Sequence, residues 1–247
     1  MSNSRLMDSL ARAGVSPERL ADALAVDVKT VQRWITLGRL PYRRHRQRIS
    51  VLIGESQSYL WPDALDEEQR ATVSRAEVVD LYPRRADAPA ELWTRLLSEA
   101  LGVVDILAFA GLFLPEQNPR VVELMASRAA VGAKVRLLLG DPQSAAVSVR
   151  GHEEGIDDAV AHKIRNVLVH YRPLQEVAGV DVRLHGTTLY NSIYRFDDDM
   201  LVSLHVHGLP AAHAPLLHLR RLSEADLFQT YAASFERIWA NAMAAWS

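Results

Sequence analysis

The sequence contains no cysteine, and this absence removes several classes of site at once. Disulfide bonds, thiol redox sensing, cysteine-ligated zinc and iron–sulfur clusters all depend on thiol groups. A metal ion would have to be held by histidines and carboxylates alone. We expect no cofactor and no metal site in this chain.

Long apolar runs are also missing. No stretch approaches the roughly 18 apolar residues that a membrane-spanning helix needs. The first residues, MSNSRLMDSL, lack the apolar core of a signal peptide. The composition, 49% hydrophobic and 23% charged over 247 residues, is typical of a globular protein with room for two domains. We therefore predict a cytoplasmic protein with no membrane association.

Lysine is scarce: 3 lysines stand against 25 arginines, a bias typical of high-GC bacterial genomes. The overall charge of -2 hides an uneven distribution. Residues 1–62 hold 10 Lys and Arg against 5 Asp and Glu, a net charge of +5, whereas the remainder holds 18 against 25, a net charge of -7. A basic N-terminal segment followed by an acidic remainder predicts a polyanionic partner for the N-terminal segment.

Residues 16–38 have the signals of two short helices joined by a tight turn. Ser16 is a candidate N-cap, followed by Pro17 at the first helical position. Asp27 is a second N-cap candidate, and Gly38 ends the second helix. The helical period predicts these inward-facing residues: Leu20, Ala21, Leu24, Val31, Trp34 and Ile35.

The second of these helices would present polar side chains outward at its beginning. The candidates for contact with base edges in a major groove are Lys29, Thr30, Gln32 and Arg33. A further helix from Pro41 would carry arginines suited to phosphate contacts, namely Arg43, Arg44, Arg46 and Arg48. This pattern predicts double-stranded DNA as a partner. The alternative is a small helical bundle for protein contacts, with the arginines merely solvated.

The stretch "LADALAVDVKTVQRWITLGRLP", followed by "YLWPD", resembles the helix-turn-helix of XRE-type (Cro/repressor-like) bacterial transcription regulators. The resemblance covers about the first quarter of the chain and implies DNA binding by the helix around residues 28–37. The family pattern usually has five helices, and the sequence has no clear fifth helix after Gly54. Helix-turn-helix proteins usually bind as dimers on two half-sites, so we expect a homodimer on an inverted-repeat operator.

Beyond the first domain, residues 63–90 are polar and interrupted by prolines, which predicts a linker with at most one helix. From residue 91 helical and apolar segments alternate. "VDILAFAG", a helix over about 119–131 and "AKVRLLLGDP" form a βαβ pattern. A long helix over about 157–178, four short strands and a C-terminal helix follow. The predicted fold class is α + α/β, with an all-helical domain over 1–62 and an α/β sandwich with a mixed sheet over 91–247.

The stretch "VRLHGTTLYNSIYRF" resembles the position of the phospholipase D superfamily motif, His-x-Lys-x4-Asp. His185 occupies the histidine position, but Thr187 stands in place of the lysine and Ser192 in place of the aspartate. A threonine supplies no positive charge to hold phosphoryl oxygens. The resemblance therefore implies a phospholipase D-like domain without catalysis. That superfamily pairs two motif halves, so one motif per chain again implies a homodimer.

A cleft in such a domain could still bind a small effector, phosphate-bearing molecules included. The candidate ligand-binding residues are His185, Thr187, Tyr190, Asn191, Tyr194, Arg195, His205, Arg150 and Arg165. Strand alternation places Tyr190 and Tyr194 on one face and Asn191 and Arg195 on the other, so not all of them can line one pocket. The alternative is that the histidines are ordinary sheet residues and that "FDDDM" is a polar hairpin turn.

Three further interpretations stay open. The segment "RGHEEGIDD" is interpreted as a Gly-flanked loop entering a helix, where Arg150 and Arg165 face an anion or bridge two subunits. His152, Glu153 and Glu154 lack an i, i+4 ligand pair, so no metal site is predicted there. A DNA-targeted nuclease or phosphodiesterase would need Lys163 or Arg195 to replace the missing lysine. A regulator whose second domain binds a protein partner is the other alternative.

Overall fold

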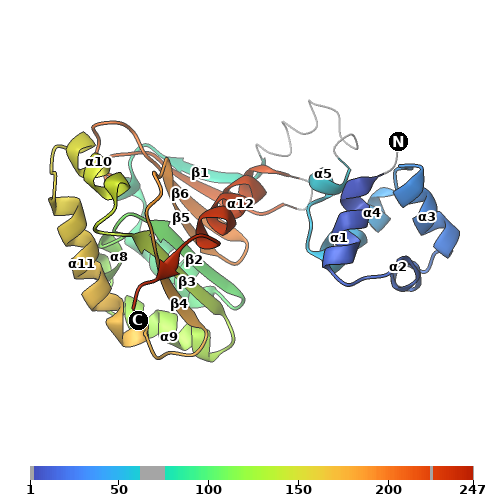
Figure 1. The fold of residues 1–247 in the computed structure, drawn as a ribbon, viewed down its shortest axis with the longest axis horizontal. Helices are drawn as coiled ribbons and strands as arrows, with labels where there is room; N and C mark the ends of the chain where they lie inside the picture. The colour runs from blue at the N-terminus through green and yellow to red at the C-terminus, as the bar shows by residue number, and fades with distance from the viewer. Residues whose placement is uncertain (1–2, 62–75, 223–224, 247) are drawn as a thin grey trace. The chain divides into compact units, whose positions relative to one another are not determined.

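The computed structural model describes residues 3–61, 76–222 and 225–246. The chain forms two compact units (Figure 1). The N-terminal unit comprises residues 1–77 together with 221–229, and the C-terminal unit comprises residues 78–220 together with 230–247. Among the described residues, no helix combines the length and the apolar character that crossing a bilayer requires.

Residues 3–61, the described first part of the N-terminal unit, contain five short helices: α1 (Ser4–Arg12), α2 (Pro17–Leu24), α3 (Val28–Thr36), α4 (Arg43–Ile53) and α5 (Gln57–Leu60). The two predicted N-caps are confirmed. The Ser16 side chain accepts a hydrogen bond from the Arg19 amide, and the Asp27 carboxylate accepts one from the Lys29 amide at 2.7 Å. Ala25 takes a left-handed conformation, with φ at 53°, in the tight turn between α2 and α3.

A small apolar core holds these helices together. The fifth helix, which the sequence pattern left unclear, begins after Gly54 and contributes Leu60 to this core. The Asn3 amide donates to the Leu60 carbonyl at 2.8 Å, which joins the start of α1 to the end of α5. The buried residues are Leu6, Leu10, Leu20, Ala21, Leu24, Val31, Trp34, Ile35, Ile49, Leu60 and Trp61. The predicted inward face of α2 and α3 is therefore confirmed.

The N-terminal unit also includes a distant piece of the chain. Glu77 is fully buried, and its carboxylate accepts hydrogen bonds from the amides of Leu227 at 2.7 Å and Phe228 at 3.2 Å. These are the first amides of α12 (Leu227–Trp239), which no intrahelical carbonyl can reach. Glu77 thus caps the last helix of the chain from 150 residues away.

The described part of the C-terminal unit forms an eight-stranded mixed sheet in the order β1-β7-β6-β5-β2-β3-β4-β8. The adjacent strands β2, β3 and β4 are parallel, and the other neighbouring pairs are antiparallel. The mixed sheet and the parallel pair predicted from the sequence are confirmed. The strands are β1 (Val78–Tyr82), β2 (Val103–Ala108), β3 (Lys134–Gly140), β4 (Val180–His185), β5 (Asn191–Phe196), β6 (Asp199–Leu204), β7 (Leu216–Arg220) and β8 (Met243–Ala244).

Helices pack on both faces of this sheet. One face is covered by α7 (Ala90–Glu99), α9 (Val121–Ala130) and α11 (Ala159–Tyr171), whose Trp93, Met125 and Tyr171 are buried against the strands. On the other face, α12 lies over β3 and is drawn in red in front of the sheet in Figure 1. The remaining short elements are η1 (Arg85–Asp87), α8 (Phe113–Gln117), α10 (Ala145–Glu153) and η2 (Arg172–Leu174).

An ionic cluster, buried at Arg136 and Asp105 and exposed at Glu236, joins α12 to this face. Arg136 on β3 donates to both carboxylate oxygens of Asp105 on β2, at 2.6 and 2.9 Å, and to both of Glu236 on α12, at 3.0 and 2.6 Å. Its guanidinium also lies against the rings of Phe235 and Trp239. Burial opposes the charge of Arg136, but the hydrogen bonds to Glu236 and Asp105 outweigh it and raise the pKa of the guanidinium above its ordinary value.

The predicted hairpin turn at "FDDDM" is confirmed, since Phe196 pairs with Asp199 across it. Asp197 has a further role that the sequence did not reveal. Its carboxylate accepts hydrogen bonds from the amides of Leu101, Gly102 and Val103 at 2.8, 2.8 and 2.6 Å. Burial alone would raise the pKa of Asp197, but these three hydrogen bonds and the charge of Arg195 lower it below the ordinary value. The turn therefore anchors the start of β2.

Three sequence predictions need correction. Residues 78–82, expected to belong to the linker, form the edge strand β1 paired with β7; the following Pro83 masked this strand in the sequence pattern. The other linker residues, 63–75, lie outside the described residues. The chain end at residues 243–244, expected to be helical, pairs with β4 as β8. Finally, Arg150, His152 and Glu153 lie within helix α10 and not in a loop.

Gly151 explains why a glycine stands inside α10. A Cβ atom at this position would lie 2.0 Å from the Asp157 carbonyl oxygen, far inside van der Waals contact. The Asp157 and Ile156 amides donate to the Gly151 carbonyl at 2.9 and 3.0 Å, so the chain folds back tightly over this residue. Glycine allows this close approach because it has no Cβ atom.

Candidate functional site

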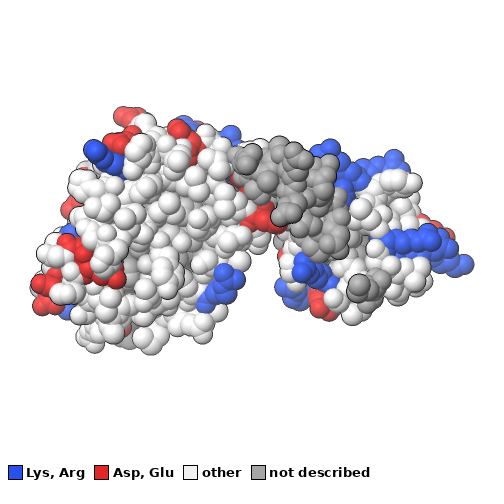
Figure 2. Space-filling view, turned by 90° about the horizontal axis from the view of Figure 1, so that it is seen from above, with Lys and Arg blue, Asp and Glu red and all other residues white. Residues whose placement is uncertain are grey.

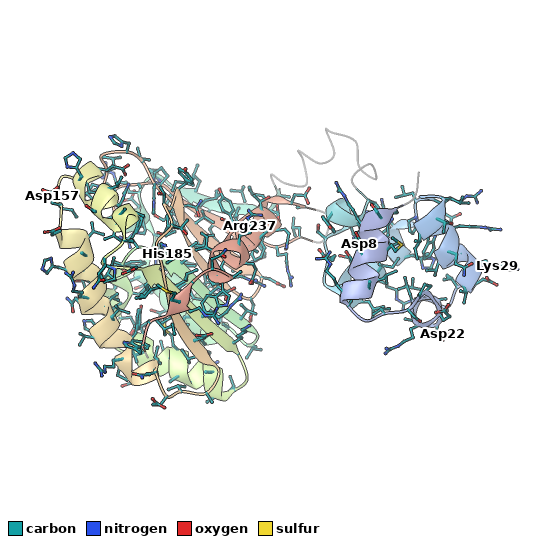
Figure 3. All side chains as sticks on the ribbon, viewed as in Figure 1. Asp8, Asp22, Lys29, Asp157, His185 and Arg237 are labelled. Atoms are coloured by element: carbon teal, nitrogen blue, oxygen red, sulfur yellow. The ribbon has the colours of Figure 1, made fainter. Side chains whose placement is uncertain are left out.

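The outer side of α3 is the first candidate surface. Because Val31, Trp34 and Ile35 are buried, the helical period turns the other side of α3 to solvent. Lys29, Gln32 and Arg33 are exposed there, and Thr30 is half-buried. In Figure 3 the side chain of Lys29 points away from the body of the N-terminal unit. These are the residues that we expected to reach base edges.

The arginines of α4 divide between surface and core. Arg43, Arg44 and Arg48 are exposed. Arg46 is only 8% exposed, and its Nε has no hydrogen-bond partner among the described residues. It shares the inner face of α4 with Ile49, three residues on, and this placement contradicts the predicted phosphate contact.

We call the exposed residues Lys29, Arg33, Arg43, Arg44 and Arg48 the basic surface. Figure 2 shows blue Lys and Arg atoms over much of the N-terminal unit in that view, with few red ones beside them. Such a distribution suits contact with phosphates, whose attraction to Lys and Arg is independent of sequence.

A cavity of about 220 Å³ in the C-terminal unit is the second candidate site. It lies where β2 ends at Ala108, β5 begins near Ser192 and β6 is followed by His205, all of which line it. This is the edge of the sheet where the parallel strands have their carboxyl ends, which is the usual place for ligands in α/β sheets. Two short segments also line it, the loop 109–112 and residues 210–212.

His205 is held in one protonation state by its two hydrogen bonds. Its Nδ1 lies 3.1 Å from the Leu189 carbonyl oxygen, which can only accept, so Nδ1 carries the proton. Its Nε2 then accepts from the Ser192 hydroxyl at 3.1 Å. Burial is the main cause that lowers the pKa of His205 to about 4, so the ring is neutral at pH 7. The ring also stacks on Phe109, with centroids 5.9 Å apart.

Arg85 provides a positive charge in the cavity wall. Its guanidinium lies 3.7 Å from the centre of the Phe113 ring, and its Nε donates to the Ala211 carbonyl at 3.3 Å. Burial lowers the pKa of Arg85, whose charge is partly removed from water. Within the described residues, no carboxylate lies within ion-pair distance of this side chain.

Three other charged residues that line the cavity differ in whether their charge is paired within the protein. Arg150 is buried and already paired: it donates to Glu154 at 2.7 Å and to the Leu209 carbonyl at 2.9 Å. Lys163 on α11 and Glu116 on α8 are exposed, and neither makes an ion pair with another described residue. Arg85 and Lys163 therefore keep their charges available to an occupant.

Of the predicted ligand-binding residues, Tyr194, His205 and Arg150 line this cavity, but His185 does not. His185 is 3% exposed and lies inside the C-terminal unit in Figure 3. Its Nδ1 accepts from the Thr187 amide at 3.3 Å, so Nε2 carries the proton donated to the Ala108 carbonyl at 3.3 Å. The alternative of a core histidine, satisfied by its neighbours, describes His185 correctly.

The other predicted ligand-binding residues are not brought together. Thr187, Tyr190 and Arg165 are exposed outside the lining, and Asn191 is half-buried outside it. Arg195 points to the opposite face of the sheet, where it lies 3.6 Å from Asp105, because it alternates with Tyr194 along β5. The candidate residues are therefore not gathered in one pocket, as the alternation along the strand predicted, and His185 lies outside the cavity.

Some lining residues were missed from the sequence. Arg85 lies within residues 63–90, which the pattern assigned to a linker, and Phe113 lies between the apolar run "VDILAFAG" and the helix expected from about residue 119, so no local signal marked them. Lys163 had a signal, since it lies three residues after Val160 on α11 and both line the cavity. In the described part of the chain, no group of three His, Asp or Glu side chains is arranged to hold a metal ion.

Comparison with known proteins gives only distant similarity. No protein-family model matches the chain, and no curated protein matches its sequence. Among solved structures, the archaeal chromatin protein TrmBL2, described as showing a novel mode of DNA binding, has 13% identity and a TM-score of 0.39 over 72% of this chain. This chain covers 59% of the length of the TrmBL2 chain. Nuc, a phospholipase D family member from Salmonella typhimurium, has 12% identity and a TM-score of 0.36 over 64% of this chain and 90% of its own.

Proposed function

We propose that this protein is a DNA-binding transcription regulator whose C-terminal unit holds a small-molecule effector. In this proposal the N-terminal unit is a helix-turn-helix domain of the XRE type, and α3 enters the major groove. The supporting observation is that one side of α3 is entirely core while its other side presents Lys29, Gln32 and Arg33 to solvent. Arginine and lysine pair with guanine, and glutamine with adenine, in direct readout.

The proposal includes a homodimer on an inverted-repeat operator. One recognition helix offers too few base contacts for useful specificity, and helix-turn-helix proteins usually reach it with two half-sites. The basic surface would supply phosphate contacts that fix the helix in the groove. An effector in the cavity would act by binding one arrangement of the dimer more tightly than the other.

We also propose that the cavity is not catalytic, and that the C-terminal unit is a phospholipase D-like domain that has lost its chemistry. His205 is a weak base because its pKa is about 4, and both its ring nitrogens are already engaged. Thr187, at the lysine position of the motif, lies outside the cavity. Hydrolysis of an activated phosphodiester by the purified protein, lost in His205→Asn, would refute this part.

Selection from a random DNA library with the full chain tests the proposal. We expect an enriched inverted repeat, bound with a stoichiometry of two chains per site. The double variant Gln32→Ala/Arg33→Ala should then lose about 2–4 kcal/mol of specific binding free energy in fluorescence anisotropy, since each bidentate contact contributes about 1–3 kcal/mol. Arg19→Ala, which removes an exposed arginine from α2, is the matched control and should bind like the wild type.

The arginines of the basic surface need a different readout. Arg44→Ala should weaken binding to all sequences alike and lower the slope of log K against log salt by about 1. Arg46 is buried, so a change in DNA affinity on its replacement would come only with loss of folding. Failure to enrich any sequence, with unchanged binding in the double variant, would refute the DNA-binding role.

A further inference from the structure

The charges that line the cavity do not cancel. The lining contains three cations, Arg85, Arg150 and Lys163, and two carboxylates, Glu116 and Glu154. Arg150 and Glu154 satisfy one another. The remaining groups therefore carry a net charge of +1, and His205 adds nothing because both its nitrogens are fixed in the neutral form at pH 7. An occupant with one negative charge would bring the cavity to neutrality.

Arg85 is the group that gains most from such an occupant. Its guanidinium is partly desolvated against Phe113, and among the described residues it uses only its Nε, which donates to the Ala211 carbonyl. A desolvated charge without a partner raises the free energy of the folded state, and an anion with good hydrogen-bond geometry offsets this. The planar guanidinium fork matches the two oxygens of a carboxylate.

Neutral donors are also available beside it. Ala110 and Gly111 line the same cavity, and the amide of neither residue donates to any acceptor within the described residues. Gly111 has a left-handed conformation, with φ at 64°, so the loop turns sharply at this point. Unpaired amides in a turn are suitable partners for anionic oxygens.

The rest of the lining is apolar and limits the size of the occupant. Phe109, Leu112, Val160 and Pro210 surround the polar groups. A volume of about 220 Å³ lies below the range of about 300–1,000 Å³ that is typical of pockets for drug-sized ligands, which suits a compact molecule. Phosphate monoesters at neutral pH carry more than one negative charge and would leave the cavity negative.

We propose that the cavity binds a compact organic acid by its carboxylate, with Arg85 and Lys163 flanking the anion and the apolar side chains around Phe109 holding the body. This assignment rests on the effector role proposed above and names the ligand class for it. Ser192 and His205 are engaged with each other, so they shape the wall and leave the charge to the two cations.

Calorimetric titration of the full chain with acetate, butyrate, benzoate, benzamide and inorganic phosphate tests this. We expect at least one of the three carboxylates to bind at millimolar concentration or below. Benzamide matches benzoate in shape but has no charge, and should bind about tenfold or more weakly than benzoate. Absence of binding by all three carboxylates, tighter binding of phosphate, or equal binding of benzamide and benzoate would each overturn the assignment.

Two variants locate the site. Arg85→Gln should weaken carboxylate binding about tenfold or more, whereas Arg84→Gln, an exposed neighbour outside the lining, should bind like the wild type. If Arg85→Gln fails to fold, Lys163→Gln on the exposed surface of α11 decides instead, with an expected loss of several-fold. Unchanged binding in the folded variant refutes the site. The titrations contain no DNA, so a failure of DNA binding leaves their outcome distinguishable.

Discussion

Lowering the pH should weaken the C-terminal unit through His205, which is neutral in the folded chain. The imidazole has an ordinary pKa of 6.5 and a folded pKa of about 4. The stabilisation is therefore complete above pH 6.5 and is lost as the pH falls from there toward 4, because the unfolded chain takes up the proton more readily. At about 1.4 kcal/mol per pH unit, the loss amounts to about 3 kcal/mol.

The variant His205→Asn isolates this effect. The asparagine amide can still donate to the Leu189 carbonyl, as Nδ1 does, but it does not titrate. Urea unfolding followed by hydrogen exchange in peptides from β5 and β6 reports on this unit. The wild type should lose about 3 kcal/mol more than the variant between neutral pH and about pH 4. The buried His185, whose pKa burial also lowers, is common to both proteins and cancels. Parallel pH profiles for the two proteins would refute the reasoning.

Two further changes test contacts that hold the sheet together. Arg136→Leu leaves the buried Asp105 carboxylate with only Arg195, 3.6 Å away, and should lower the free energy of unfolding by about 3 kcal/mol, measured by urea titration. A loss below about 1 kcal/mol would mean that Arg136 and Asp105 do not form a buried ion pair. Asp197→Ala removes the acceptor of three amides and should cost about 2 kcal/mol in the same assay, whereas Asp158→Ala, an exposed carboxylate, should cost less than about 0.5 kcal/mol.

Local signals predicted the helices of the N-terminal unit well because their causes are local. Ser16 and Asp27 accept hydrogen bonds from amides three and two residues on, so cap and helix stand next to each other in the sequence. Arg46 could have been placed by the same logic, since it precedes the buried Ile49 by three residues. The predicted phosphate contact relied on the charge of Arg46 and not on its position on the helix.

The candidate site in the C-terminal unit could not be predicted in this way, because distant pairings build it. Arg85 reaches the cavity because β1, just before it, pairs with β7, and Tyr82 lies opposite Leu216. The residues around Pro83 contain no local sequence signal that identifies β7 as the partner of β1. Likewise, His185 and His205 both follow apolar strand residues, and only their surroundings make one a core residue and the other part of a cavity wall. The motif resemblance pointed to His185, which does not line the cavity, whereas His205 does.

The capping of α12 by Glu77 affects where the chain can be cut into expression fragments. A fragment that stops after residue 77 would contain a buried carboxylate whose two donors, the amides of Leu227 and Phe228, are encoded about 150 residues later. An expression fragment that keeps Glu77 together with its donors therefore includes residues 221–229 as well, joined through a short artificial connection or supplied as a separate peptide, whereas the apolar core of the N-terminal helices lies within residues 6–61. In the coding sequence this unit is split, and the C-terminal sheet is an insertion within it.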